Sequence, residues 1–430
     1  MGDLTVALHG TVLGRLLDRG RDFDFRADAE AIRQFGLGNR VLSRAVPLVP
    51  RPQAAQLGLR QNFFSELLPE GQARERLARE AGVRETDVVG MLRAFGRDVA
   101  GAVQLWDPDV PGEPKQPDTE PIDDDDVADL LRNVQAAPLG NTSRRSKREG
   151  KSSLNGVQNK IVLVRDGDRW SRALDGYPST HILKPVVGRL PTVIFDEEYG
   201  SRFARALGLA AFETTLQVFG GVTALVIERY DRSPAAPEGR IHQEDCNQVL
   251  GCAGDEKYEK WGGRGLRDVA KQLAGQDLPR LLRLVTMSVA VGNLDLHLKN
   301  ISVLHDERGG TALAPAYDIV PQHFQRNDGE MGLDVNGVRS HAAITRDDLV
   351  GEGASWGVRD ADEIVRGALA EIELVARAEM PHIGAEIALQ ESIQRMAGNL
   401  LDGRPVGGST ASPARRDGGW GIGPVHDPLI

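Results

Sequence analysis

The fold of this chain is decided by one stretch, Asn293-Leu294-Asp295-Leu296-His297-Leu298-Lys299-Asn300, which places Asp295 five positions before Asn300. A second carboxylate follows in Ala316-Tyr317-Asp318-Ile319-Val320. Between them, residues 301–304 and 311–313 have strand-like patterns, which predict a hairpin that returns the chain to the same site. Carboxylate and amide oxygens are the ligands that Mg²⁺ prefers. Asn300 and Asp318 are therefore candidate metal ligands beside a reactive carboxylate, Asp295.

The spacing of Asp295 and Asn300 matches that of the catalytic loop of protein kinases, where the Asp accepts the substrate hydroxyl proton and the Asn holds a metal ion. Phosphoryl transfer depends on positioning and charge neutralisation, so a cation on the phosphates is also expected. Lys184 ends a predicted strand and is the candidate cation. Glu198, on the helix that follows, is expected to orient it. Strand lysine, helix glutamate, hinge, long helix and catalytic loop follow one another in the order found in kinases.

Length and composition restrict the class of protein. The chain has 430 residues, enough for two or three domains. A net charge of −10 and a pI near 5.5 argue against nucleic-acid binding by the chain as a whole. Two cysteines, Cys246 and Cys252, are too few for a disulfide framework and are expected to be small buried residues. There is no leader-like N-terminus and no run of eighteen apolar residues, so we expect a cytoplasmic protein without a membrane partner.

Changes in composition along the chain predict five segments. These are a small N-terminal β/α domain at 1–108, a loop-rich charged connector at 109–150, a kinase N-lobe at 151–232, a helical C-lobe at 233–402 and a disordered tail at 403–430. The connector is expected to be solvated because its acidic block, Asp123 to Asp126, and its basic cluster, Arg144 to Lys151, bury little surface. Its basic end could instead attract phosphate.

Periodicity places the main elements within these segments. The N-terminal domain should open with a hairpin at 4–17 and have a core of Phe63, Phe64, Leu67, Leu77, Val88, Leu92 and Phe95. Strands are expected at 160–164, at 180–183 before Pro185, at 213–219 and at 223–228, and helices at 197–207, 243–250, 278–292, 360–380 and 381–401.

A phosphate-covering loop is predicted before the first N-lobe strand. Gly150-Lys151-Ser152 is not a Walker A motif, because Arg145 stands where its first glycine would be. The alternative runs from Ser153 to Lys160, where one glycine and exposed amides could approach phosphates. Its candidate contacts are Asn155, Gly156, Val157, Gln158, Asn159 and Lys160.

Several motifs in a fixed order make the sequence similar to one family. They are Asn62-Phe63-Phe64 with Leu67-Leu68-Pro69-Glu70-Gly71, Ser153-Leu154-Asn155-Gly156-Val157-Gln158, Thr180-His181-Ile182-Leu183-Lys184-Pro185, Asp196-Glu197-Glu198-Tyr199, Glu228-Arg229-Tyr230-Asp231-Arg232, His242-Gln243-Glu244-Asp245, Asp295 to Asn300 and Tyr317-Asp318-Ile319. At these residues the chain resembles the HipA family of bacterial serine/threonine kinases, the toxins of type II toxin–antitoxin modules. The resemblance implies an α+β fold: a bilobal protein-kinase-like fold, with a small β-rich N-lobe and a helical C-lobe, behind a small N-terminal β/α domain.

The resemblance also implies ATP and Mg²⁺ as cofactors. Hinge contacts are expected from Glu228, Arg229 and Tyr230, and phosphate-side contacts from Asn155 to Lys160, Lys184, His297, Leu298, Lys299, Asn300, Tyr317 and Asp318. Asn300 and Asp318 would hold the metal and Asp295 would be catalytic. Family members autophosphorylate the serine that corresponds to Ser153, which expels its loop and disables ATP binding; Ser152 beside it leaves the modified position open.

The implied partners are proteins. A helix-turn-helix antitoxin (HipB-like) would neutralise the kinase and supply the DNA contact, and the substrate would be a protein, with aminoacyl-tRNA synthetases as the known class. Leu294 and Leu296 depart from the small or polar residues common in this loop. Two other hypotheses stay open, a small-molecule phosphotransferase of the aminoglycoside type and a nucleotide-binding corepressor scaffold without turnover. A scaffold would need no base, so Asp295 argues against it.

Overall fold

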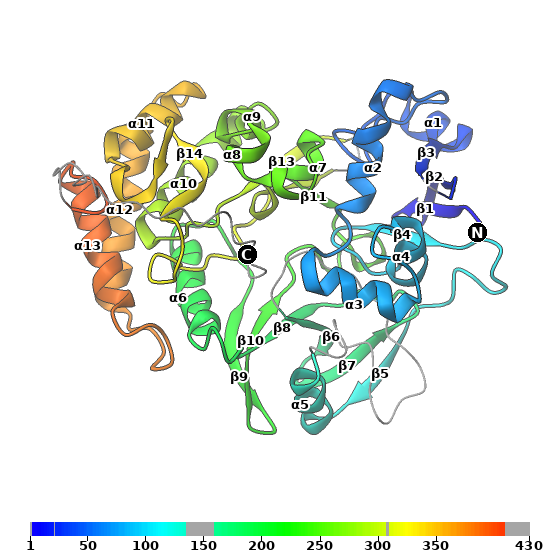
Figure 1. The fold of residues 1–430 in the computed structure, drawn as a ribbon, viewed down its shortest axis with the longest axis horizontal. Helices are drawn as coiled ribbons and strands as arrows, with labels where there is room; N and C mark the ends of the chain where they lie inside the picture. The colour runs from blue at the N-terminus through cyan, green and yellow to red at the C-terminus, as the bar shows by residue number, and fades with distance from the viewer. Residues whose placement is uncertain (1, 21, 135–158, 307–308, 409–430) are drawn as a thin grey trace, which may run out of the picture.

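The computed structural model describes residues 2–20, 22–134, 159–306 and 309–408. An N-terminal domain packs against two lobes, one built on a β-sheet and the other mostly helical (Figure 1). The fold is the α+β, kinase-like arrangement expected from the sequence. No helix in these ranges is long and apolar enough to cross a membrane.

The N-terminal domain is a four-stranded sheet covered by short helices. Its strands lie in the order β3-β2-β1-β4, and β1 and β2 form the predicted hairpin. The bounds are β1 Leu4–Leu8, β2 Thr11–Asp18, β3 Phe23–Ala27, β4 Val103–Trp106, α1 Ala29–Phe35, α2 Leu57–Ser65, α3 Gly71–Ala81 and α4 Val88–Phe95. All seven residues predicted for this core are buried.

The N-lobe is a six-stranded antiparallel sheet in the order β5-β7-β6-β8-β10-β9. Its elements are β5 Asp118–Ile122, α5 Asp124–Arg132, β6 Ile161–Asp166, β7 Arg169–Leu174, β8 His181–Pro185, α6 Val193–Ala206, β9 Thr214–Phe219 and β10 Val222–Glu228. Pro185 is the last residue of β8, at the position where the proline was expected to stop the strand. This is tolerated because pairing with β6 ends at Leu183, so no donor is required of Pro185 on that side.

The prediction of a loop-rich connector is wrong for the described residues 109–134. Strand β5 pairs with β7, and α5 packs Val127, Leu130 and Leu131 into the N-lobe core. The acidic block, Asp123 to Asp126, had suggested a solvated chain, but it forms the N-terminus of helix α5. Asp123 and Asp126 form a capping box, and carboxylates favour a helix N-terminus because they complement its dipole.

The C-lobe surrounds one long buried helix, α10. Its elements are β11 Gln243–Asp245, α7 Cys246–Leu250, α8 Glu259–Gly262, α9 Leu266–Ala270, α10 Leu278–Val291, β12 Ser302–His305, β13 Thr311–Leu313, β14 Glu330–Val335, β15 Val338–Ser340, α11 Arg346–Ser355, α12 Ala361–Ala378 and α13 Leu389–Leu401. Short 3-10 turns lie at Ala54–Gln56, Pro237–Gly239, Gly254–Lys257, Gly275–Asp277, Leu298–Asn300 and His341–Ala343. The predicted hairpin after the catalytic loop is β12–β13.

Two predicted helices of this lobe start late. Residues 243–245 form β11, which pairs with β12, so the helix predicted from 243 begins at Cys246. The last helix begins at Leu389 rather than near 381. Tertiary contacts hold the preceding segment to α6 instead: the His382 ring stacks on Phe195 at 4.7 Å, and the Glu386 amide donates to Asp196.

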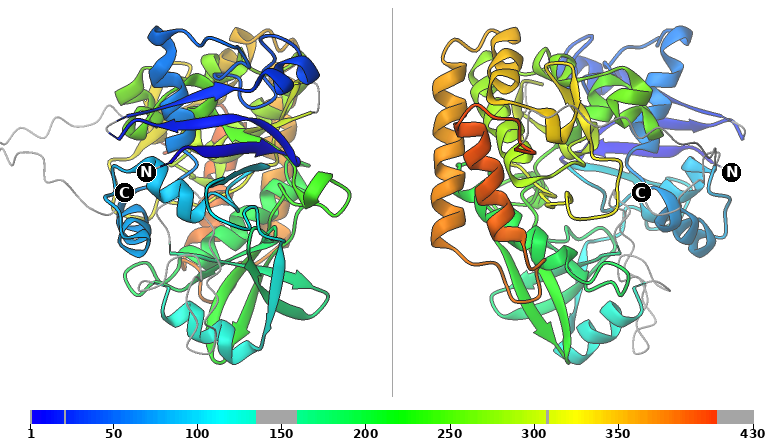
Figure 2. Two further views of the ribbon diagram at one scale, coloured as in Figure 1. Left: turned by 90° about the vertical axis from the view of Figure 1, so that its right-hand side faces the viewer. Right: turned by 60° about the vertical axis from the view of Figure 1, so that its left-hand side comes forward.

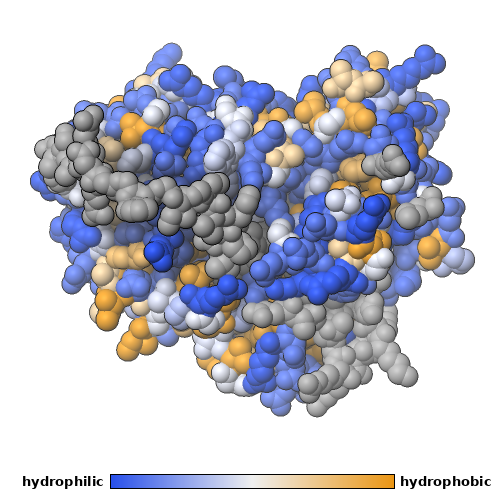
Figure 3. Space-filling model, viewed as in Figure 1, coloured by the Kyte–Doolittle hydropathy of each residue, from blue (hydrophilic) through white to orange (hydrophobic). Residues whose placement is uncertain are grey.

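The three parts share buried contacts. Leu77 of α3 and Phe95 of α4 pack with Val162 of β6 in a small core that joins the N-terminal domain to the N-lobe sheet. Figure 2 shows α12 and α13 side by side on the far edge of the C-lobe, away from this joint. The face in Figure 3 is mostly hydrophilic, with some hydrophobic groups toward its lower left. The loop between α12 and α13 exposes Met380, Ile383 and Ile387.

Candidate active site

The catalytic loop is delivered by the end of α10. Gly292 adopts a left-handed conformation (φ 75°) that ends the helix, and the Asn293 amide donates to the carbonyl of Ser288. The loop then folds on itself, because the His297 amide donates to the Asp295 carbonyl and the Asn300 side-chain amide donates to the same oxygen at 2.8 Å. Asp295 and Asn300 are thus held on one short turn.

The Asp295 carboxylate has defined neighbours. The Tyr258 hydroxyl donates to its Oδ1 at 2.9 Å, and Nε2 of His297 lies 3.8 Å from the same atom. The Asp295 side chain is 30% exposed, so a substrate can reach it. Burial lowers the pKa of His297, whose Nδ1 has no hydrogen-bond partner among the described residues.

The predicted phosphate cation lies at the centre of the site. The ammonium of Lys184 donates to both carboxylate oxygens of Glu197, at 2.7 and 2.9 Å, and to Oδ1 of Asp318 at 2.7 Å. Burial opposes the charge of Lys184, but Asp318 and Glu197 raise its pKa above the usual value. Lys184 is therefore a buried, charged lysine, as phosphate pairing requires.

The expectation that Glu198 orients Lys184 is wrong. Glu197 does so, while Glu198 accepts two hydrogen bonds from Arg202 one turn further along α6. Consecutive helical residues point about 100° apart, so only one of two adjacent glutamates can face the lysine. The sequence contains both, and the choice depends on how α6 is rotated against the sheet.

Glycine 200 allows α6 to approach Asp318. A Cβ at Gly200 would lie 2.1 Å from the carbonyl oxygen of Ile319, so the next segment packs directly on the helix backbone. Asp318 itself has φ 55°, a left-handed conformation that is costly outside glycine and is typical of functional sites. Its side chain is 39% exposed, so the carboxylate opens toward solvent beside Lys184.

Charges at the site are strongly coupled. Burial opposes ionisation of Asp318, yet Lys184 and Lys160 outweigh it and lower the pKa of Asp318 to about 2. Burial and the charge of Lys184 lower the pKa of Lys160 to about 8. Lys160, the last residue of the predicted covering loop, thus lies within the field of the same site.

We expect Glu197→Gln to slow phosphate transfer roughly tenfold, because a charge-assisted hydrogen bond contributes about 1.5–3 kcal/mol. In this variant Asp318 would be the one remaining carboxylate among the described residues that is paired with the Lys184 ammonium. Glu198→Gln is the matched control and should change the rate less than twofold, since its partner Arg202 is partly exposed. Initial rates at saturating ATP test this. Equal rates for the two variants would contradict the assignment of Glu197.

The positive charge of Lys299 is compensated by carboxylates, so Lys299 does not present an unpaired ammonium to phosphates. Its ammonium lies 2.6 Å from Oε2 of Glu66 and 3.0 Å from Oε1 of Glu70, both in the N-terminal domain. Burial opposes ionisation of Glu70, but Lys299 and Lys257 lower its pKa to about 2. The sequence did not indicate that these two glutamates contact the predicted catalytic loop, because the local pattern around Leu67-Leu68-Pro69 does not reveal which lobe they meet.

Tyr317 ties the metal motif to the catalytic loop. Its hydroxyl donates to the Lys299 carbonyl at 2.6 Å and lies 2.6 Å from Oγ of Ser302. Leu298 is fully buried, so its contribution to a ligand is limited to backbone. Tyr317 and Leu298 therefore shape the loop rather than present polar side-chain atoms of their own.

The hinge lies between β10 and β11. The Tyr230 hydroxyl donates to Gln243 at 2.5 Å, and the Glu228 carboxylate accepts from the Glu213 amide. The Arg229 side chain is buried against the N-terminal domain, where its guanidinium donates to the Val99 carbonyl. Only the Arg229 backbone is therefore left to contact a ligand. Its amide donates to Thr180.

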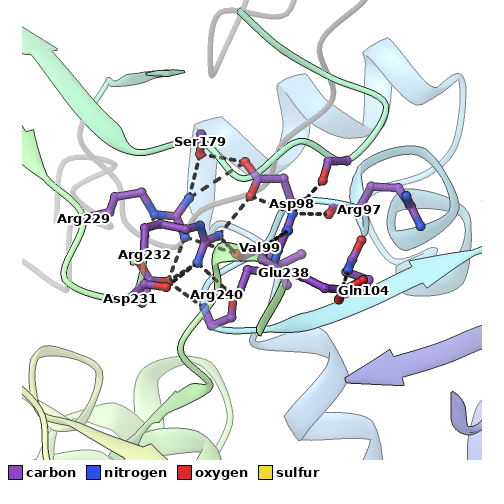
Figure 4. A network of polar contacts seen from close by, with 12 residues as sticks. Arg97, Asp98, Val99, Gln104, Ser179, Arg229, Asp231, Arg232, Glu238 and Arg240 are labelled. Atoms are coloured by element: carbon purple, nitrogen blue, oxygen red, sulfur yellow. Dashed lines mark hydrogen bonds and ion pairs between the residues drawn. The ribbon is translucent and has the colours of Figure 1, made fainter. Parts of the chain in front are cut away.

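A buried ion network fixes this hinge to the N-terminal domain (Figure 4). Asp98 accepts from Ser179 at 2.6 Å and from Arg232 at 2.9 Å. Asp231 accepts from Arg229, from Arg232 and from the Gly101 amide. Burial opposes ionisation of Asp98, but Arg232 and its neighbours hold the pKa of this carboxyl below its usual range.

The donor set suits a magnesium ion held jointly with phosphates. Within the described ranges no three His, Cys, Asp or Glu residues are arranged to hold a metal by themselves. Mg²⁺ differs from zinc or calcium in that one or two protein oxygens plus phosphates and waters suffice. Asn300 uses its NH₂ group on Asp295, which leaves its oxygen as the ligating end, and Asp318 has an exposed carboxylate.

Part of the predicted site lies outside the described residues. This holds for Ser152, Ser153, Asn155, Gly156, Val157 and Gln158. Asn159 is described, and its side-chain oxygen accepts from Arg76 of α3 at 3.1 Å. The start of β6 therefore also contacts the N-terminal domain.

Comparison with protein-family models gives two matches that agree with this division. The model of the HipA N-terminal domain matches residues 4–106, and the model of the HipA-like C-terminal domain matches residues 152–379. The chain belongs to the HipA family. Residues 107–151, which include β5 and α5, fall between the two matches.

Curated relatives of this HipA family chain are named as kinases. The putative kinase Y4mE of Sinorhizobium fredii is 36% identical, over 60% of this chain and 63% of that protein, so the chain spans less than two thirds of this relative. The putative kinase Y4dM of the same organism is 31% identical, over 67% and 68%. The serine/threonine-protein kinase toxin HipA of Shewanella oneidensis is 28% identical, over 74% and 75%.

A solved structure confirms the fold. It is the HipA chain in the complex of HipA, HipB and operator DNA from Shewanella oneidensis, with a TM-score of 0.70 and 22% identity. The match covers 93% of this chain and 96% of that one. The N-terminal domain and both lobes are therefore arranged as in HipA.

Proposed function

We propose that this protein transfers the γ-phosphate of ATP to a serine or threonine hydroxyl of a protein. The observation that carries the proposal is the arrangement of two contacting pairs, Asp295 with Asn300 and Lys184 with Asp318, which Tyr317 links through its hydrogen bond to the Lys299 carbonyl. These are the parts that phosphoryl transfer requires, a base, metal ligands and a cation on the phosphates. The names of the relatives support the same reaction class.

In the proposed step, the acceptor hydroxyl oxygen forms a bond to the γ-phosphorus while the bond from that phosphorus to the oxygen of ADP breaks. The hydroxyl proton passes to Asp295, which Tyr258 holds through Oδ1. Lys184 neutralises phosphate charge, and Glu197 keeps its ammonium in place. A magnesium ion held by Asn300 and Asp318 would supply further neutralisation of the phosphates.

The remaining family properties are proposed on resemblance. ATP would contact the hinge at Glu228, Arg229 and Tyr230, and the phosphates would contact Asn155 to Lys160, Lys184 and His297 to Asn300. Ser153 is the proposed site of autophosphorylation. A HipB-like antitoxin is the proposed partner and would carry the DNA contact, since this chain has a net charge of −10. An aminoacyl-tRNA synthetase is the proposed substrate class.

The proposal is tested by incubating the protein with ATP, Mg²⁺ and a lysate of the source cells, followed by mass spectrometry of new phosphosites. We expect phosphoserine or phosphothreonine on a small set of proteins and on residues 152–153 of the chain. An Asp295→Asn sample run in parallel identifies sites that depend on this protein.

Two outcomes would contradict the proposal. Phosphate on an aminoglycoside or a sugar, without any on protein, would favour a small-molecule phosphotransferase. ATP binding without turnover in the presence of lysate would favour a corepressor scaffold.

A further inference from the structure

Two carboxylates of the N-terminal domain, Glu66 and Glu70, reach Lys299 of the catalytic loop. Glu70 precedes α3, and its two oxygens contact two different lysines: Oε2 accepts from Lys257 at 2.7 Å, and Oε1 accepts from Lys299 at 3.0 Å. Lys299 belongs to the catalytic loop, and Lys257 directly precedes Tyr258. Glu70 therefore bridges the loop that carries Asp295 and the segment that carries its hydrogen-bond donor.

Tyr258 is held in place on both sides. Its ring lies edge-on to His297 at 5.1 Å between centroids, and the Lys257 ammonium lies 5.3 Å from the ring centre. Glu66 adds a second tie, because it contacts Lys299 and accepts from the Gly254 amide at the start of the same segment. The hydroxyl thus reaches Oδ1 of Asp295 from a fixed position.

A carboxylate that has one oxygen fixed cannot turn freely. Asp295 is partly exposed, and apart from the contacts at Oδ1 its side chain could rotate about two bonds. The Tyr258 bond to Oδ1 leaves Oδ2 as the oxygen that faces an incoming hydroxyl. General-base catalysis depends on such geometry before it depends on acidity.

We propose that Glu70 and Tyr258 are positioning residues for phosphoryl transfer, and that the N-terminal domain thereby acts on the orientation of Asp295. This rests on the proposed function, in which Asp295 accepts the hydroxyl proton. The N-terminal domain would then be part of the catalytic apparatus as well as a packing partner.

The test is the initial rate of labelled-phosphate transfer by the full chain, with Mg²⁺ and ATP, to the acceptor proteins of the lysate, with kcat and KM for ATP taken from its dependence on ATP. We expect Tyr258→Phe and Glu70→Gln each to lower kcat about tenfold, the size of one hydrogen bond to a charged group, with KM for ATP unchanged. The melting temperature should stay that of the parent for Tyr258→Phe and should fall for Glu70→Gln, because the two lysines that Glu70 contacts are buried. Glu70→Asp keeps the charge and should lose less than Glu70→Gln. The double variant should lose less than the product of the two single losses, because both residues act on one carboxylate.

Matched controls are Tyr177→Phe, in the turn after β7, and Glu75→Gln, on the exposed face of α3. Both should keep kcat within twofold of the parent. A Tyr258→Phe variant with unchanged kcat would overturn the proposal, and so would a loss of kcat in this variant matched by a lower melting temperature, which would mean a merely structural role.

Amide hydrogen exchange separates this proposal from the proposed function. We expect Glu70→Gln to speed exchange in residues 254–258 and 293–300 and to leave β9 and β10 unchanged. If the parent chain released no ADP and transferred no phosphate, the proposed function would fail, whereas unchanged exchange in 293–300 would overturn the link through Glu70 alone.

Discussion

Asp295→Asn is expected to lower the rate of phosphate transfer about 10³-fold, the middle of the range for loss of a general base. Asparagine has nearly the same shape and can still accept the Tyr258 hydroxyl, so the loop should keep its fold. It lacks the negative charge that accepts the proton. Transfer of labelled phosphate to protein measures the effect, and the melting temperature and ATP affinity should stay near those of the parent.

The exposed Asp360, at the start of α12, supplies a matched control. Asp360→Asn removes the same charge far from the site and should change the transfer rate less than twofold. A transfer rate for Asp295→Asn equal to that of the parent would mean that Asp295 is not the base, and the proposed mechanism would then have to be abandoned.

The largest expected loss of stability follows from Asp98→Asn. This change leaves Arg232 and Arg240 with less negative charge in a buried network, and removing one partner of a buried ion pair costs about 3–5 kcal/mol. Ser179 would still find an acceptor in the asparagine side chain. We expect a clear fall in the urea midpoint of unfolding, since the joint between the N-terminal domain and the hinge would carry uncompensated charge.

Asp129→Asn is the comparison for that experiment. Asp129 pairs with Arg132 on the exposed face of α5, and such pairs contribute less than about 1 kcal/mol. Its urea midpoint should stay close to that of the parent. Equal shifts for Asp98→Asn and Asp129→Asn would show that the buried network adds nothing to stability.

The sequence predicted the features that depend on local pattern. It predicted the hairpin at β1–β2, the long helix α10 with its terminal Gly292, the hairpin β12–β13 and the kinase-like order of parts. Hydrophobic periodicity, turn residues and motif spacing are all properties of short stretches of sequence. Lys184 and Asp318 were predicted as parts of one site, but their direct ion pair is a finding of the structure.

What the sequence could not reveal depends on contacts between distant segments. The choice of Glu197 over Glu198 follows from the rotation of α6, which Gly200 and Ile319 fix across a long sequence separation. Strand β5 looked like connector because its apolar content is low and its place in the sheet comes from β7. The roles of Asp98 and Glu70 exist only once the N-terminal domain is docked.

The motif His242-Gln243-Glu244-Asp245 illustrates the same point. Glu244 is fully buried and accepts from Ser43 at 2.7 Å and from the Arg44 amide at 2.8 Å, and His242 contacts the Leu42 carbonyl. A family motif of the C-lobe thus serves to hold the N-terminal domain. The partners of these polar residues lie far away in the sequence, so their structural role is seen only in the folded protein.

The joint between the N-terminal domain and the lobes has a consequence for genetics. Asp98 of this domain contacts Arg232 at the hinge, and Ser43 contacts Glu244 of the C-lobe, so residues 4–106 are anchored to both of these parts. A collection of random loss-of-function alleles should therefore not cluster at the catalytic loop alone. Many should fall in the N-terminal domain, and a kinase-only fragment beginning after residue 106 should be insoluble, because Val162 and three buried arginines would lose their cover.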